Sequence, residues 1–276
     1  LPRILLAAVV GFGLSLSGIV FQAILRNPLA DPFILGVSSG AAFGAIVGIL
    51  LGLGFATGVP LAAFGGTLLT LALLMALGRR RMGTESSTLL LTGVIINAFF
   101  TALIMYFIST ATDSRLHSML FWLYGDLGQS RYAHLAVSAP AVLLGGVLVF
   151  AFSRDLNLLT TGEETARQLG VGVEGVKTLC LVTVSLLVGL VVSFSGLIGF
   201  VGLIVPHLAR MALGSDHRLL VPASALGGAA FLVAADTLAR IVISPSELPV
   251  GVVTAFLGAP FFLYLLETRG SRWMRS

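Results

Sequence analysis

The sequence predicts an all-α membrane protein, a polytopic bundle of helices. Of its 276 residues, 57% are hydrophobic and only 10% are charged, and the mean hydropathy is +1.04. A soluble domain carries about 25% charged residues, so this chain has too few charges to cover a water-exposed globule. Its apolar runs lack the period-two alternation of barrel strands, and helices are then the structure that satisfies the backbone in lipid.

Nine apolar runs are expected to span the membrane. At a rise of 1.5 Å per residue, a run of about 20 residues crosses the roughly 30 Å of hydrocarbon in a bilayer. One run, 198–213, is short and contains Pro206 and His207, so we expect this span to be broken or tilted. The nine runs are 4–24, 34–53, 59–77, 88–109, 133–152, 178–196, 198–213, 220–238 and 249–266.

The positions of Lys and Arg predict which side of the membrane each loop faces. With residues 154–177 in the cytoplasm, twelve basic residues fall inside and four outside, as the positive-inside rule favours. The N-terminus of this chain then lies outside and its C-terminus inside. A start on the outside suggests that a further helix precedes this chain. The four outside residues are Arg3, Arg115, Arg131 and Arg240.

The longest polar interruption of the chain is the segment 154–177, RDLNLLTTGEETARQLGVGVEGVK. It contains four acidic and three basic residues around an amphipathic centre, 163–170. A polar segment of this length has to lie outside the hydrocarbon. It therefore predicts a loop that either is solvated or contacts a partner protein.

Glycines and aromatic residues make two further predictions. Gly44, Gly48 and Gly52 repeat at four-residue spacing, which is typical of close helix–helix contact, and adjacent or near-adjacent pairs add further small surfaces. In the loop 110–132, aromatic residues indicate a helix in the membrane interface. The glycine pairs are Gly11 with Gly13, Gly65 with Gly66, and Gly227 with Gly228; the aromatic residues are Phe121, Trp122, Tyr124 and Tyr132.

The sequence contains few of the residue patterns that are typical of catalytic or metal sites. The four histidines are scattered and Cys180 is the single thiol, so zinc-ligand spacing is absent and no metal site is expected. The segment 170–178 resembles a phosphate loop, but Val176 stands where glycine must precede Lys177. Basic residues lie at the ends of apolar runs rather than on one face, which argues against nucleic-acid binding. The chain is expected to be a non-enzyme with no cofactor of its own.

Two polar turns on the predicted cytoplasmic side have two readings each. In 26–33, RNPLADPF, the prolines exclude a continuous helix, so the segment is either a stiff turn or a constriction at the inner mouth of a pathway. The residues Ser86, Ser87 and Thr88 either cap a helix or line the same mouth. No carboxylate lies at the middle of a run, which weakens an ion-coupled secondary transporter but leaves it as the alternative.

Four ordered blocks, spread over nearly the whole chain, carry a resemblance to a known family. The blocks are 1–44, GEETARQLGV at 162–171, GLIGFVGLIVPHLARMALGSDHR at 196–218, and 235–262. In these blocks the sequence resembles the FecCD family, the permease subunits of binding-protein-dependent ABC importers for iron-siderophores, haem and cobalamin. The resemblance implies a type II ABC importer permease fold with ten helices, of which this chain lacks the first, and a single transmembrane domain over 1–276 with 154–177 as its coupling loop.

The resemblance also implies roles for particular residues. Arg3 and Arg240 match arginines that meet glutamates of the substrate-binding protein, and Asn27, Leu29, Ser86 and Ser87 lie where the family narrows its cytoplasmic gate. Ala166, Leu169 and Val171 are expected to form an apolar patch for an ATPase subunit, beside charges that pair with it. The coupling residues are Glu163, Glu164, Ala166, Arg167, Leu169 and Gly170.

The resemblance thus implies a subunit of the bacterial cytoplasmic membrane. It would work with a second copy of itself, two ATPase subunits that bind ATP-Mg, and a periplasmic binding protein that delivers a metal chelate. A self-contained carrier and a membrane scaffold are the competing hypotheses. They differ from the importer in needing no ATPase partner, and a scaffold would carry no chelate.

Overall fold

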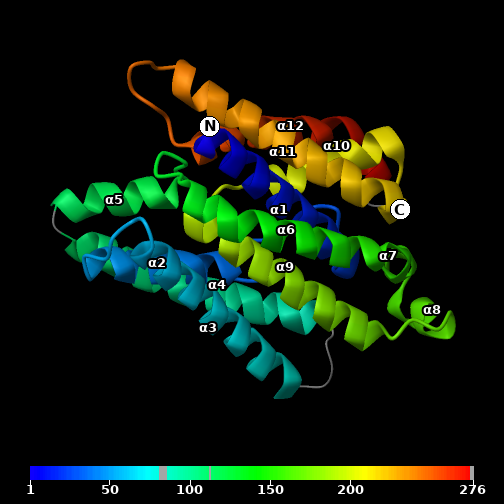
Figure 1. Ribbon diagram of the computed structural model, residues 1–276. Coiled ribbons are helices and arrows are strands. Elements are labelled where there is room, and N and C mark those ends of the chain that lie inside the picture. The colour runs from blue at the N-terminus through cyan, green and yellow to red at the C-terminus, as the bar shows by residue number, and fades with distance from the viewer. Residues whose placement is uncertain (81–85, 112, 274–276) are drawn as a thin grey trace.

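The computed structural model describes residues 1–80, 86–111 and 113–273, and this part of the chain is all α-helical. The helices run side by side in a bundle with α5 at one end and α8 at the other, called here the α5 end and the α8 end (Figure 1). The helices are α1 (Pro2–Ile24), α2 (Val37–Leu50), α3 (Gly58–Arg80), α4 (Ser86–Thr110), α5 (Asp113–Leu123), α6 (Tyr132–Ala151), α7 (Ser153–Thr160), α8 (Glu163–Gln168), α9 (Val173–Ser195), α10 (Val201–Leu213), α11 (His217–Ile241) and α12 (Val250–Trp273).

Each of the nine predicted runs overlaps one of these helices. Among the described residues, six helices are long and apolar enough to cross a membrane: α1, α3, α4, α6, α9 and α11. The other three, α2, α10 and the apolar part of α12, are shorter than 18 residues. The helical class is therefore confirmed, together with six spans, while the count of nine stays a prediction.

Helix α1 lies at the centre of the bundle, where it packs against α6, α9, α10 and α11. Its contacts are close because glycines face each other across them. A Cβ atom on Gly11 would overlap the carbonyl oxygen of Gly228 in α11, and one on Gly18 would overlap that of Gly202 in α10. Helices without side chains at the crossing approach to backbone contact, which is a strong source of packing energy in lipid.

Glycines also bring α2 and α3 into backbone contact. A Cβ on Gly66 would overlap the carbonyl oxygen of Gly40, and one on Gly44 would overlap that of Ala62. Of the predicted repeat, Gly44 and Gly48 contact α3, whereas Gly52 follows α2 with a positive φ of 71° and open space around it. The predicted close packing is thus confirmed for Gly44 and Gly48 and is wrong for Gly52.

The run 198–213, which is expected to be broken or tilted, is irregular only at its start. Pro206 lies inside a continuous α10, and the chain is irregular earlier, at 196–200, where Gly196 and Phe200 have φ values of 67° and 69°. The Leu197 amide donates to the Trp122 carbonyl oxygen, and the Asp126 amide donates to the Ser195 carbonyl oxygen. These two bonds join the irregular segment to the end of α5 and the residues that follow it. Within the protein, the Trp122 side chain is buried, while Tyr124 and Tyr132 are exposed.

Candidate functional site

The α8 end of the bundle presents the predicted coupling segment as a helix of six residues, α8, between two glycines. Gly162 and Gly170 have φ values of 126° and 87°, a region that strains other residues. Lys177 at the base of α9 is fully buried, and its Nζ lies 2.8 Å from Oε1 of Glu163. This ion pair fixes the start of α8 to α9.

The other predicted coupling residues divide into buried and exposed ones. Arg167 pairs with Glu174 at 3.0 Å and more loosely with Glu164 at 3.7 Å, and Glu164 is 76% exposed. Ala166 and Val171 are buried, so the predicted apolar patch of Ala166, Leu169 and Val171 is wrong: only Leu169 is exposed. The surface available to a partner is therefore Leu169 and Gly170 flanked by Glu164 and Arg167.

The turn between α1 and α2 holds the predicted gate residues Asn27 and Leu29. The Asn27 Oδ1 atom accepts a hydrogen bond of 2.9 Å from the Leu29 amide, and the Leu29 side chain is exposed. The end of the same turn packs on α4, where a Cβ on Gly93 would lie 2.7 Å from Cα of Leu35. Ser86 and Ser87 begin α4, and their side chains lie outside the described residues, so their role as gate residues stays a prediction.

Asp31 in this turn has a perturbed carboxyl group. Burial raises its pKa to about 6, against the opposing effect of a hydrogen bond that its Oδ1 accepts from the Phe33 amide. A raised carboxyl pKa means that the folded protein binds the proton more tightly than the unfolded chain does. The stability that Asp31 contributes is therefore present below pH 4 and is lost as the pH rises through about 6.

We expect Asp31→Asn to remove this pH dependence. Asparagine keeps the oxygen that accepts from the Phe33 amide but carries no charge. The melting temperature of the variant, relative to the wild type, should rise between pH 4 and pH 7 in detergent solution. A constant difference over that range would show that Asp31 is ionised freely in the folded protein.

A cluster of charges at the α5 end joins the predicted docking residues Arg3 and Arg240. Asp236 is 1% exposed and lies between them: the Arg3 guanidinium contacts it at 2.9 Å, and Arg240 Nε lies 3.3 Å from its Oδ2. Arg3 also contacts Glu247 at 2.6 Å. The structure thus brings both arginines together but gives Arg3 a structural task, holding the start of α1 to α11.

An apolar groove of about 670 Å³ runs along α12 toward the end of α5. It is lined by residues of the irregular segment before α10, by the small residues Gly251, Ala255 and Ala259 of α12, and by Phe33, Phe200 and Phe256. The sequence does not predict this groove. The small residues recur at four-residue spacing, which was the available signal, but nothing in the sequence tells a groove from a helix contact.

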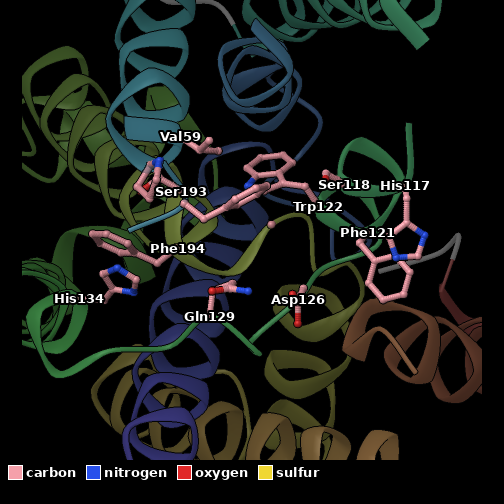
Figure 2. A pocket seen from close by; sticks show the side chains of 13 residues that line it. Val59, His117, Ser118, Phe121, Trp122, Asp126, Gln129, His134, Ser193 and Phe194 are labelled. Carbon is pink, nitrogen blue, oxygen red and sulfur yellow. The ribbon is translucent and has the colours of Figure 1, made fainter. Parts of the chain in front are cut away.

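A second cavity of about 220 Å³ lies at the α5 end, between α5, α6 and the end of α9. Figure 2 shows His134 stacked on Phe194 on one side, His117 and Phe121 on the other, and Gln129 and Asp126 between them. The His134 ring is held at 4.7 Å from that of Phe194 and by a contact of 2.9 Å from Nε2 to the Ala56 carbonyl oxygen. Within the described residues, no group of three acidic, Cys or His side chains is placed to hold a metal ion.

Six helices that are long and apolar enough to cross a membrane, packed in one bundle, are the architecture of a multi-pass membrane protein. The chain belongs to the FecCD transport family, which matches residues 1–268.

Named relatives and solved structures agree with this assignment. The chain is 46% identical to the cobalamin import system permease protein BtuC of Halobacterium salinarum, over 99% of this chain and 73% of that protein. It is 43% identical to the hemin transport system permease protein HmuU of Yersinia pestis, over 96% of this chain and 81% of that protein. A structure described as an inward-facing metal-chelate type ABC transporter matches with a TM-score of 0.90 and 37% identity, over 96% of this chain and 85% of that one.

Proposed function

We propose that this chain is the permease subunit of an ABC importer that moves a metal chelate from the periplasm to the cytoplasm. The observation that carries the proposal is its similarity, over nearly all its length, to permeases named for cobalamin and hemin import. An iron-siderophore is the third chelate that the family resemblance implies. Hydrolysis of ATP-Mg belongs to partner subunits, and the permease needs no cofactor of its own.

The charge distribution supports an orientation with the α8 end in the cytoplasm and the α5 end outside, in a bacterial cytoplasmic membrane with nine spans. The exposed face of α8 then meets an ATPase subunit, through Leu169, Gly170, Glu164 and Arg167. The cluster around Asp236 then faces the binding protein. Binding protein and ATP drive transport because each contacts the outward-open and inward-open states differently.

The groove along α12 supports a homodimer. Large apolar side chains of α12 next to it are exposed, among them Phe256 and Leu263. Two copies that face each other through these helices would enclose a pathway with apolar walls, lined by few charges. A bulky chelate in such a pathway would be recognised mainly by its shape.

No feature of the described residues favours an ion-coupled carrier. The buried carboxylate of a spanning helix, Asp236, lies near the end of α11 and is neutralised by two arginines. A coupling carboxylate needs to change its protonation or bind an ion during transport. A membrane scaffold is likewise without a supporting observation.

The proposal is tested by reconstituting the permease with its ATPase subunits and binding protein in liposomes. We expect ATP-dependent accumulation of one of three labelled chelates, cobalamin, haem or a ferric siderophore. We also expect ATPase activity that rises when the loaded binding protein is added. Uptake of none of the three, together with unstimulated ATPase activity, would contradict the proposal.

Docking of the binding protein gives a separate prediction. Arg240→Gln should weaken binding of the binding protein several-fold with little change in melting temperature, because Asp236 keeps Arg3 as its partner. The loss should shrink at high salt, since rim charges act mainly through long-range attraction. Arg3→Gln is the informative comparison, and it should lower the melting temperature as well. Equal affinity in both variants and the wild type would make the arginines purely structural.

A further inference from the structure

The side chain of Asn157 in α7 is placed against the N-terminus of α11. Its Oδ1 atom accepts from the His217 amide at 2.9 Å and lies 2.6 Å from His217 Nδ1. Its Nδ2 atom donates to Asp216 Oδ1 at 2.8 Å. One amide group therefore makes three polar contacts between two helices that are 60 residues apart in the chain.

These partners leave one arrangement of hydrogen atoms. Because Oδ1 can only accept, His217 donates from Nδ1, and because Asp216 is a carboxylate, the Asn157 NH₂ group faces it. Asp216 Oδ1 also accepts from the Arg218 amide at 3.0 Å and so caps α11. The pKa of the Asp216 carboxyl is lowered by the Arg218 amide and by the Asn157 side chain, which favours the charged form. Asn157 and Asp216 together cover the helix N-terminus.

The junction lies between the predicted coupling helix and the rest of the bundle. From Asn157, α7 continues to Thr160 and leads through Gly162 directly into α8. From Asp216, α11 runs for 25 residues, about 37 Å at 1.5 Å per residue. Its far end carries Asp236, which binds Arg3 and Arg240. Helix α11 is thus a continuous rod from the coupling segment to the charged cluster.

We propose that Asn157 is a positioning residue that transmits movement of α8 to α11, and so links the ATPase side of the permease to the docking side. This inference rests on the proposed function. Helix α8 is held to α9 by Glu163 and Lys177, and α7 is held to α11 by Asn157. A displacement of the coupling segment by the ATPase therefore acts on two long helices, of which α11 reaches the predicted docking cluster.

The test measures coupling in the reconstituted complex for Asn157→Ala, with Thr160→Ala as the matched control. Thr160 is exposed on the same helix, and its hydroxyl donates to the Asn157 carbonyl oxygen. For Asn157→Ala we expect the ratio of stimulated to basal ATPase activity to fall at least about fivefold. The ATP hydrolysed per chelate transported should rise in parallel. Thr160→Ala should leave both quantities unchanged.

A second pair of variants decides the matter if Asn157→Ala does not fold. Asn157→Asp places two carboxylates together, whereas the double variant Asn157→Asp/Asp216→Asn returns the pair to one carboxylate and one amide and so removes the repulsion. We expect the single variant to lose stimulation and the double variant to regain it. Equal stimulation in these two variants, or in wild type and Asn157→Ala, overturns the inference. A wild-type complex that takes up no chelate overturns instead the proposed function.

Discussion

A Gly66→Ala variant is expected to be markedly less stable than the wild type, whereas Gly65→Ala is expected to fold normally. A Cβ atom on Gly66 overlaps the carbonyl oxygen of Gly40 and lies 3.2 Å from the Gly44 amide nitrogen, so α2 and α3 must separate. Overpacking of this kind costs about 1–3 kcal/mol. For a chain of this size that is a drop of roughly 2–12 °C in melting temperature.

The neighbouring glycine is the control because it lies in the same helix. A Cβ on Gly65 meets nothing within 4 Å, and alanine is the better helix former. Melting temperature and the monodisperse fraction in detergent would be measured for both variants. Equal values for the two would mean that α2 and α3 do not touch along Gly40 and Gly66.

A Glu163→Gln variant is expected to be destabilised by about 3 kcal/mol, because it removes the carboxylate that faces a fully buried ammonium group. Since the same ion pair fixes α8 to α9, stimulation of the ATPase by the loaded binding protein should fall as well. Thermal unfolding in detergent and ATPase assays in liposomes measure the two effects.

Two further variants separate the ion pair from a general effect of charge. Glu164→Gln changes the adjacent, 76% exposed carboxylate, whose pair with Arg167 is long at 3.7 Å, and should change stability by less than about 0.5 kcal/mol. The double variant Glu163→Gln/Lys177→Met should recover most of the lost stability, since an apolar pair often replaces a buried ion pair without loss. If Glu163→Gln and Glu164→Gln behave alike, the buried pair contributes nothing.

The positions of the helices could be predicted from the sequence because the bilayer imposes both length and apolarity on each span. Predicted and observed boundaries of the long spans differ by a few residues, as for 133–152 and α6. Hydropathy does not show which way each residue of a helix faces. Gly65 and Gly66 are adjacent and identical residues, yet Gly65 faces open space and Gly66 faces the backbone of Gly40. The direction in which a residue faces is set by how the helices pack, and that packing depends on residues far apart in the chain.

The same limit applies to the candidate site. The segment 154–177 is recognisable by its polarity, but a helix of six residues is too short to show from sequence which face is buried, so the burial of Ala166 was not predicted. The ion pair of Arg3 with Asp236 could not be predicted either, because the two residues lie 233 positions apart in the chain. Asp216 before an apolar helix is a recognisable cap signal, whereas the Asn157 side chain that completes it carries no signal in sequence.

The central position of α1 has a consequence for biosynthesis. The glycines it packs against, Gly202 and Gly228, are translated about 180–220 residues after their counterparts Gly18 and Gly11. At 5–20 residues per second, the ribosome needs roughly 10 s or more to make them. During that delay the face of α1 that carries Gly11 and Gly18 contacts lipid or an insertion factor. Helix α1 must therefore be apolar enough to remain in the bilayer before its partners are made. Its side chains at the later contacts must also be small enough for α10 and α11 to pack closely against them.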